Sequence, residues 1–213
     1  MPPSYRLLIF LRYPQLGRTK TRLIPVLGPA GAAQLQRQMA EYLLAKLEHP
    51  AWQIQIYFTG AHSHDMQSWL GKDRFYRPQV EGDLGKRLWS GFQSAFAEDQ
   101  SVASLNRVIA VGADCPDLSV RHIHQAFEYL EHHDLVLGPA QDGGYYLIGL
   151  RQSSYSQRSL FTDISWSTSA VLLQTVAKAQ ELSLSTVQLE TLADIDRPQD
   201  LAIWHRFQAA AWR

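Results

Sequence analysis

Basic side chains gather in a short loop that follows the first apolar run of the chain. This run, Tyr5 to Leu11, leads into the loop PQLGRTKTR (Pro14 to Arg22), in which Lys20 and Arg22 follow Gly17. Glycine lets a backbone approach a phosphate chain closely, and cationic side chains neutralise that chain. The loop therefore predicts an anion site, although a charge run of this kind can also be a solvated loop.

Acidic residues follow later apolar runs. In an open α/β sheet, ligands bind outside the carboxyl ends of the strands, so these acidic loops are predicted to meet the basic loop there. Carboxylates bind Mg²⁺ or Mn²⁺, and such a cation bridges phosphate oxygens. The candidates are Asp114 in GADCPDL (112–118), Asp142 in GPAQDGGYY (138–146) and Asp196 in LADIDRPQDL (192–201).

Each acidic candidate also has a purely structural interpretation. Asp114 can fix the turn before the proline of its loop, and Asp142 can open an Asp-Gly hairpin turn. Asp196 can cap the last helix, and Asp194 is either a ligand or a strand-end residue. We favour metal binding for Asp114 because of its place after a central strand, and both interpretations stay open for the others.

The spacing of apolar residues predicts the elements that position these loops. Short apolar runs alternate with segments of helical period, which is typical of a mostly parallel sheet with helices on both faces. One helix opens with GDLGKR (82–87), where Lys86 or Arg87 is a further candidate for a phosphate contact. The predicted strands are 5–11, 53–59, 107–112, 134–138, 145–150 and 185–190, and the predicted helices contain 35–47, 84–96, 123–130, 172–179 and 197–210.

Composition narrows the class of protein. The 213 residues suffice for one domain, 1–213, and equal numbers of basic and acidic residues, 20 each, give no field that would attract nucleic acid. The one cysteine, Cys115, excludes an internal disulfide, and we interpret it as structural. Neither a signal peptide nor a membrane span is predicted, so we expect a cytoplasmic protein.

The order of motifs resembles a known family. GxxKTRL (17–23), GDLGKR, GADCPDL, GPAxDGGYYLIGL (138–150), FTDISWST (161–168) and DIDRPQDL (194–201) together resemble an uncharacterised bacterial family of glycosyltransferase-like proteins associated with radical SAM and arsenosugar gene clusters. That family is similar to the nucleotide-diphospho-sugar transferase superfamily. The resemblance implies a single-domain α/β fold of the GT-A, Rossmann-like type, with a nucleotide over the first half of the sheet and a divalent metal.

The resemblance also implies roles for individual residues. Gly17, Lys20 and Arg22 match the loop that holds phosphates in related nucleotidyltransferases. Asp114 matches the metal-binding aspartate after the central strand, and Asp196 matches the aspartate that joins it on the metal in several relatives. Asp142 lies in the segment that faces the acceptor, where it is the candidate base or acceptor ligand.

Two departures keep several functions open. The chain lacks the AGGxGxR loop of the nucleotidyltransferases, and Asp114 and Asp117 do not form a DxD triplet. We therefore expect a metal-dependent transferase with a nucleotide-diphosphate-sugar donor and a small-molecule acceptor. The alternatives are a nucleotidyltransferase acting on an NTP and a phosphorylated acceptor, and a non-catalytic nucleotide-binding module.

Overall fold

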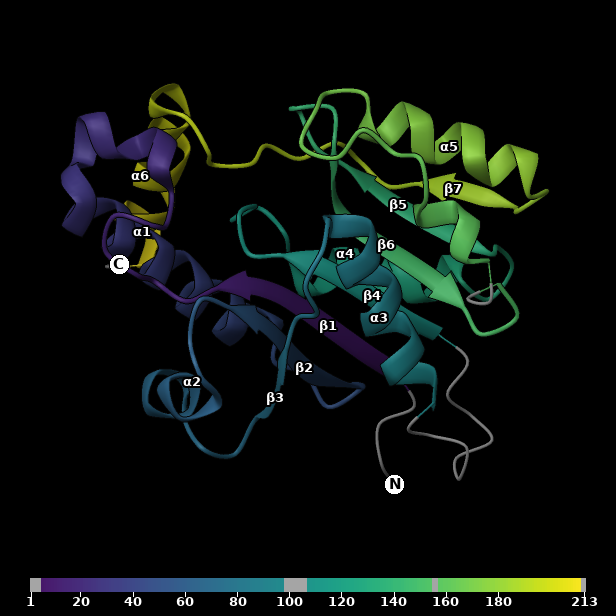
Figure 1. The fold of residues 1–213 in the computed structure, drawn as a ribbon, viewed down its shortest axis with the longest axis horizontal. Coiled ribbons are helices and arrows are strands. Elements are labelled where there is room, and N and C mark those ends of the chain that lie inside the picture. The colour runs from purple at the N-terminus through teal and green to yellow at the C-terminus, as the bar shows by residue number, and fades with distance from the viewer. Residues whose placement is uncertain (1–4, 98–106, 155–156, 212–213) are drawn as a thin grey trace.

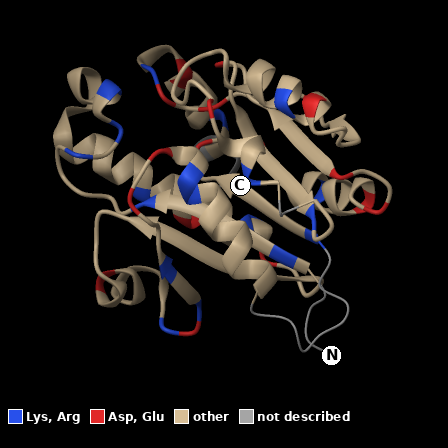
Figure 2. Cartoon of the chain, turned by 45° about the vertical axis from the view of Figure 1, so that its right-hand side comes forward, with Lys and Arg blue, Asp and Glu red and all other residues tan. Residues whose placement is uncertain are grey.

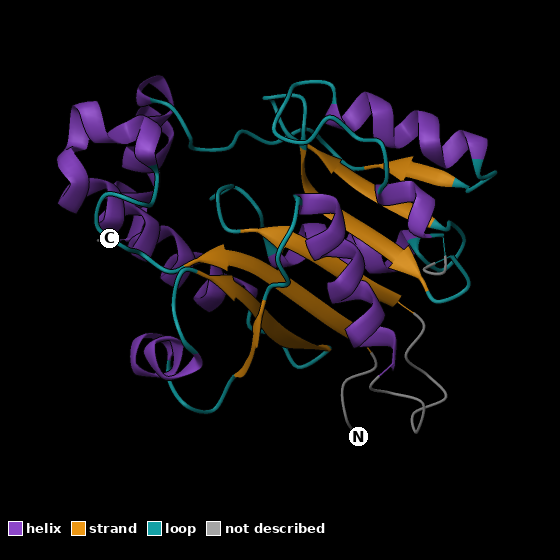
Figure 3. Cartoon of the chain, in the orientation of Figure 1, coloured by secondary structure: helices purple, strands orange, loops and turns teal. Residues whose placement is uncertain are grey.

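Strands and helices alternate along most of the chain (Figures 1 and 3). The computed structural model describes residues 5–97, 107–154 and 157–211. In chain order its elements are β1 (Tyr5–Arg12), η1 (Thr21–Leu23), α1 (Ile24–Leu47), β2 (Trp52–Thr59), α2 (Ser63–Leu70), β3 (Phe75–Pro78), α3 (Leu84–Ala97), β4 (Arg107–Gly112), α4 (Val120–Tyr129), β5 (Leu135–Pro139), β6 (Tyr145–Arg151), η2 (Arg158–Phe161), α5 (Val171–Glu181), β7 (Thr186–Gln188), η3 (Pro198–Asp200) and α6 (Leu201–Ala211).

The described strands form one seven-stranded sheet in the order β3-β2-β1-β4-β6-β5-β7. β6 pairs antiparallel with both β4 and β5, and the other pairs are parallel. Because β6 runs against its neighbours, the tight connection from β5 to β6 lies at the same edge as the carboxyl ends of β1, β2 and β4. The predicted mostly parallel α/β sheet with helices on both faces is confirmed.

Successive side chains along the strands point to opposite faces of the sheet and pack into two separate hydrophobic cores. Leu7, Ile9 and Leu11 of β1 pack with α1, α2 and α4 on one face, whereas Leu8 packs with α3, η2 and α5 on the other. This alternation is the period of two that a strand buried on both faces requires. A third cluster joins η1 and the first two-thirds of α1 to α6 through Leu23, Leu35, Met39 and Trp204, among others.

The segment after β7 crosses the carboxyl edge of the sheet on its way to α6 (Figure 1). Leu192 pairs with the β5–β6 connection, since its N–H donates to the Pro139 carbonyl at 3.0 Å and its carbonyl accepts from the Gln141 N–H at 3.0 Å. Further on, the Ile195 N–H donates to the Asp114 carbonyl at 3.0 Å. The last loop of the chain is thereby tied to the loops after β4 and β5.

Gly85, in the first turn of α3, packs directly against the loop that follows η2. A Cβ atom added there would lie 2.4 Å from the Phe161 carbonyl oxygen and 2.6 Å from the Trp166 ring. We expect Gly85→Ala to lower the free energy of unfolding by about 1–3 kcal/mol, because the backbone must shift to relieve this overlap. Gly112→Ala, where nothing lies within 4 Å, is the matched control in urea unfolding. Equal losses in the two variants would contradict the packing argument.

Asp134 joins the start of β5 to the strands on either side. Its carboxylate accepts hydrogen bonds from the Ser185 N–H at 3.0 Å, the Ser185 hydroxyl at 2.6 Å and the Ser154 hydroxyl at 2.8 Å. Burial alone would raise the pKa of this carboxyl, but the hydrogen bonds from Ser185 and Ser154 outweigh it, and the pKa lies below its ordinary 3.8.

A depressed pKa in the folded state means that the stabilisation is present above pH 3.8 and is lost as the pH falls through the folded pKa. We expect Asp134→Ala to lower the free energy of unfolding by about 1–3 kcal/mol near neutral pH, and by clearly less near pH 2.5. Denaturant unfolding at both pH values measures this. The exposed Asp73→Ala is the control, and a loss for Asp134→Ala that does not change with pH would refute the assignment.

Candidate functional site

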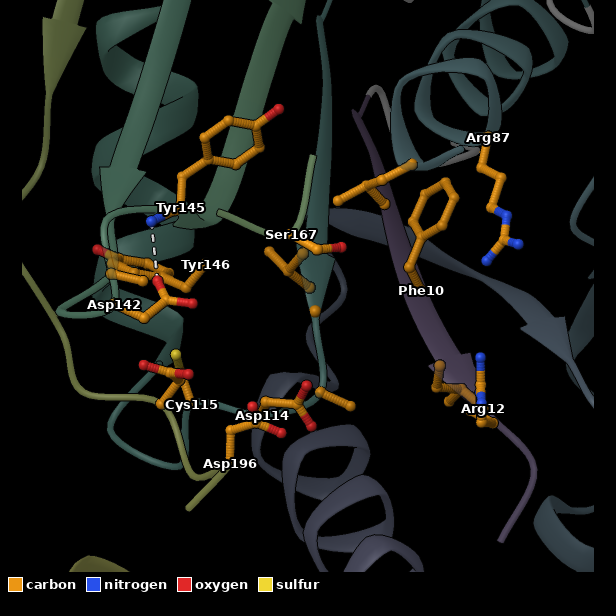
Figure 4. Close-up of a pocket in the computed structure, with 18 of the residues that line it drawn as sticks. Phe10, Arg12, Arg87, Asp114, Cys115, Asp142, Tyr145, Tyr146, Ser167 and Asp196 are labelled. Atoms are coloured by element: carbon orange, nitrogen blue, oxygen red, sulfur yellow. Dashed lines mark hydrogen bonds between the residues drawn. The ribbon is translucent and has the colours of Figure 1, made fainter. Parts of the chain in front are cut away.

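A cavity of about 760 Å³ lies at the carboxyl ends of β1, β2 and β4. Its walls come from the loop after β1, the first turn of α3, the loop after β4, the β5–β6 connection and the segment around residues 194–196. Figure 4 shows Asp114, Asp142 and Asp196 on one side of this cavity, and Arg12 and Arg87 across from them. The polar loops singled out in the sequence therefore meet in one place.

One wall of the cavity is basic. Arg12, Arg18, Lys20, Arg22 and Arg87 all line it. The Arg12 guanidinium donates to the Arg18 carbonyl at 3.1 Å, which holds the loop in its turn. Arg87 Nε is buried and has no hydrogen-bond partner among the described residues. Lys and Arg are otherwise interspersed with Asp and Glu along the chain (Figure 2).

Lys20 is the most enclosed of these cations, since its side chain is only 5% exposed. Its Nζ atom lies 2.7 Å from Asp114 Oδ1 and donates to the Ile195 carbonyl. The backbone of Lys20 is left-handed, with φ 48°, and the buried Thr19 beside it accepts from the Gln15 N–H at 3.1 Å. This turn aims the ammonium group inward, so that it joins the loops after β1 and β4 to the C-terminal segment.

Four aspartates, Asp114, Asp142, Asp194 and Asp196, form an acidic wall of the same cavity. Arg22 forms an ion pair with Asp196 in which both side chains are partly exposed. The two predicted metal ligands, Asp114 and Asp196, thus each contact a cation of the basic loop. In the described part of the chain, no group of three or more His, Cys, Asp and Glu side chains is arranged to hold a metal ion by itself.

Asp194 belongs to the site as firmly as the aspartates that the sequence singled out. Burial raises the pKa of its carboxyl above the ordinary 3.8, and the charges of Asp142 and Asp114 raise it further. The sequence feature that indicates this role for Asp194 is its position two residues before Asp196, with the buried Ile195 between them in an extended segment. In such a segment, residues two apart project to the same side.

The β5–β6 connection is both a turn and a part of the cavity wall. The Gly143 N–H donates to the Ala140 carbonyl at 3.1 Å, and Asp142 Oδ1 accepts from the Gly144 N–H at 2.8 Å. Gly143 has φ 90°, and a Cβ atom there would lie 2.3 Å from the Ser169 carbonyl oxygen. The hairpin interpretation of this motif is confirmed, and Asp142 lines the cavity as well.

The capping interpretation of Asp196 is wrong. The N-cap is Arg197, and Asp200 completes a capping box with it, because the Asp200 Oδ2 atom accepts from the N–H groups of Asp196 and Arg197 at 3.1 and 2.7 Å. The carboxylate of Asp196 is directed instead to Arg22. Asp196 therefore lines the cavity and does not cap a helix.

The remaining candidates are placed less centrally. Gly17 is exposed, adopts φ 72° in the turn of the basic loop, and does not line the cavity. Lys86 is also exposed and outside the lining, whereas its neighbour Arg87 is within it. Cys115 lines the cavity but is 3% exposed, and burial followed by the charges of Asp114 and Asp194 raises the pKa of its thiol well above the ordinary value. A thiol held protonated in this way is a poor nucleophile.

Solved structures of other proteins share this fold. A Desulfovibrio desulfuricans G20 protein, provisionally named a nucleotide-diphospho-sugar transferase, is 32% identical over 96% of this chain and 87% of its own, with a TM-score of 0.88. CMP:2-keto-3-deoxy-manno-octonic acid synthetase in complex with CTP is 10% identical, with a TM-score of 0.57 and 97% and 99% of the two chains covered. A Mycobacterium tuberculosis H37Rv protein in complex with manganese is 10% identical, with a TM-score of 0.54 and 93% and 95% covered.

The two distant structures establish a common fold and no more. No curated protein matches the chain. No helix of the described residues is both long and apolar enough to cross a membrane. The model of one family, uncharacterized proteins conserved in bacteria (DUF2064), matches residues 43–168, which is more than half of the chain. The chain therefore belongs to the DUF2064 family of bacterial proteins.

Proposed function

We propose that this protein is a metal-dependent transferase that uses a nucleotide-diphosphate-sugar donor. The observation that carries the proposal is the one cavity that five basic side chains and four aspartates line together, with Lys20 and Arg22 in contact with two of these aspartates. An anionic diphosphate and a divalent cation are the pair of ligands that such a lining suits. The name of the Desulfovibrio protein supports the same class of donor.

The donor set fits a magnesium or manganese ion. Carboxylate oxygens are the ligands that Mg²⁺ prefers, and Mg²⁺ is commonly held by one or two carboxylates together with substrate phosphates. Asp114 and Asp196 would hold it, and a site completed by the substrate does not need a third protein ligand. The manganese complex of the mycobacterial protein is consistent with divalent metal binding on this fold.

Lys20, Arg22 and Arg87 would bind the diphosphate. When bound, the metal stabilises the negative charge that develops on the leaving diphosphate. The cationic side chains add fixed positive charge at the same place, and this form of catalysis is mainly electrostatic. Asp142 would accept the proton of the attacking acceptor hydroxyl, as the new bond to the sugar carbon forms and the nucleoside diphosphate leaves with the bonding electron pair.

Nucleotidyl transfer is the second candidate. Five basic side chains on one wall are enough charge for a triphosphate, and the fold is shared with a synthetase that binds CTP. The two reactions differ in the leaving group, which is a nucleoside diphosphate in glycosyl transfer and pyrophosphate in nucleotidyl transfer.

The association of this protein with radical SAM and arsenosugar gene clusters stays a prediction.

A substitution at Asp196 tests the metal site without disturbing a buried charge. We expect Asp196→Ala to weaken the binding of a nucleoside diphosphate about tenfold or more in Mn²⁺. In EDTA it should not weaken the binding, because the substitution removes a negative charge and frees Arg22 for the diphosphate. Isothermal titration calorimetry with UDP, GDP, ADP and CDP measures both affinities. Asp117→Ala removes an aspartate near the site that does not line the cavity and should behave as the parent protein does. Equal affinities for Asp196→Ala and the parent in Mn²⁺ would refute the ligand assignment.

Product analysis separates the two transferase reactions. With Mn²⁺ and a panel of UDP-, GDP-, ADP- and CDP-sugars, we expect slow release of the nucleoside diphosphate, because water can replace the acceptor. With the corresponding NTPs we expect no pyrophosphate release, either alone or with sugar phosphates. Chromatography of the nucleotide products and a pyrophosphate assay distinguish the outcomes. Pyrophosphate release from an NTP and a sugar phosphate would favour nucleotidyl transfer. Failure of every nucleotide to bind in the presence of metal would exclude both reactions.

A further inference from the structure

A second cavity, of about 500 Å³, adjoins the first at the acidic wall. Six residues line both cavities: Arg22, Asp142, Ser167, Thr168, Asp194 and Asp196. Arg22, Asp142, Asp194 and Asp196 therefore lie where the two cavities meet, which we call the junction. If the donor occupies the first cavity, its reacting end lies at this junction and the second cavity receives the molecule that attacks it. This step rests on the proposed function.

All side chains around the second cavity are polar. They comprise four aspartates, two arginines, two glutamines and three hydroxyl residues, with no aliphatic or aromatic side chain among them. The first cavity differs, because Phe10, Leu84, Leu88, Ile148 and other apolar residues also line it. A lipid or an aromatic acceptor would bury apolar surface against charged groups in the second cavity, which is unfavourable. A small hydrophilic acceptor is the class that remains.

The charges of the second cavity disfavour a phosphorylated acceptor. Four carboxylates face two guanidinium groups, and Arg22 is already paired with Asp196. A phosphate group would therefore meet excess negative charge, which a bound divalent cation would only cancel. Hydroxyl groups, in contrast, can donate to carboxylates and both donate to and accept from glutamine amides.

We infer that the second cavity binds a neutral, polyhydroxylated acceptor, a sugar or a polyol, and that one of its hydroxyl groups is the nucleophile. The carboxylate of Asp142 at the junction then faces both the hydroxyl and the donor. This acceptor class belongs to glycosyl transfer, since nucleotidyl transfer to a phosphorylated acceptor would need a cationic second cavity. The lining of the acceptor site thus distinguishes between reactions that the first cavity alone accommodates.

Saturation-transfer difference NMR tests the inference on the full chain. The protein is saturated with Mg²⁺, which is not paramagnetic, and with the nucleoside diphosphate that calorimetry identifies. Glycerol, myo-inositol and D-glucose are then compared with glycerol 3-phosphate, myo-inositol 1-phosphate and D-glucose 6-phosphate. We expect transfer to at least one neutral compound and weaker or no transfer to its phosphate.

Two glutamines that line only the second cavity, Gln141 and Gln199, provide the variants. Gln141→Ala and Gln199→Ala should each raise the Kd of the neutral ligand about fivefold, as the loss of one hydrogen bond would, with the nucleotide Kd unchanged. Gln188→Ala, an exposed glutamine of β7 outside both cavities, is the matched control and should change neither.

The outcomes separate the two proposals. Preferential binding of the phosphates, or nucleotide binding without binding of any neutral compound, would overturn the acceptor class and leave the donor site intact. Neutral binding that is unaffected in both glutamine variants would place the acceptor elsewhere and also overturn the inference. Failure of every nucleotide to bind in the presence of metal would overturn the proposed function, and the acceptor assignment with it.

Discussion

The site depends on one buried ammonium group. Lys20 contacts the carboxylate of Asp114 and the carbonyl of Ile195, and so joins three segments that are distant in the sequence. A cation as enclosed as Lys20 needs such partners, because an ammonium group withdrawn from water without them is unfavourable. The Ile195 N–H completes the junction by donating to the Asp114 carbonyl. The positions of Asp194 and Asp196 on either side of Ile195 follow from this arrangement, as does the ion pair between Asp196 and Arg22.

Much of the fold could be predicted because the main strands bury side chains on both faces. Six of the seven described strands fall where the apolar runs lie, and β4 has the predicted bounds, 107–112. The elements that the pattern missed are β3, of four residues with a terminal proline, and α2, of eight residues with Met66 as its one buried residue. Elements that short carry too few apolar positions for a period to emerge. The antiparallel direction of β6 could not be predicted from its own residues either, because the direction of a strand depends on the neighbouring strands with which it pairs.

The site was predictable where chemistry and topology agree. Charged loops after parallel strands must converge at one edge, so Lys20, Arg22, Asp114 and Asp142 could be grouped from the sequence alone. The cap formed by Arg197 and Asp200, without Asp196, could not be predicted, because several acidic residues of DIDRPQD compete for the same N–H groups and the backbone decides among them. The involvement of Asp194 follows from the extended path after β7, which the β5–β6 connection imposes through Leu192.

Charge and polarity are divided between two cavities that meet at the acidic wall. The larger cavity combines cations with apolar side chains, which suits a molecule with an anionic part and a less polar part, such as a nucleotide. The smaller cavity is lined by neither aliphatic nor aromatic side chains, and it has no surplus of cations. A transferase must bring a donor and an acceptor together and exclude the wrong partner at each side, and a difference in lining between two cavities is one means to that end. Because Asp142, Asp194 and Asp196 line both cavities, the carboxylates that would hold the metal and receive the proton stand where the two substrates would meet.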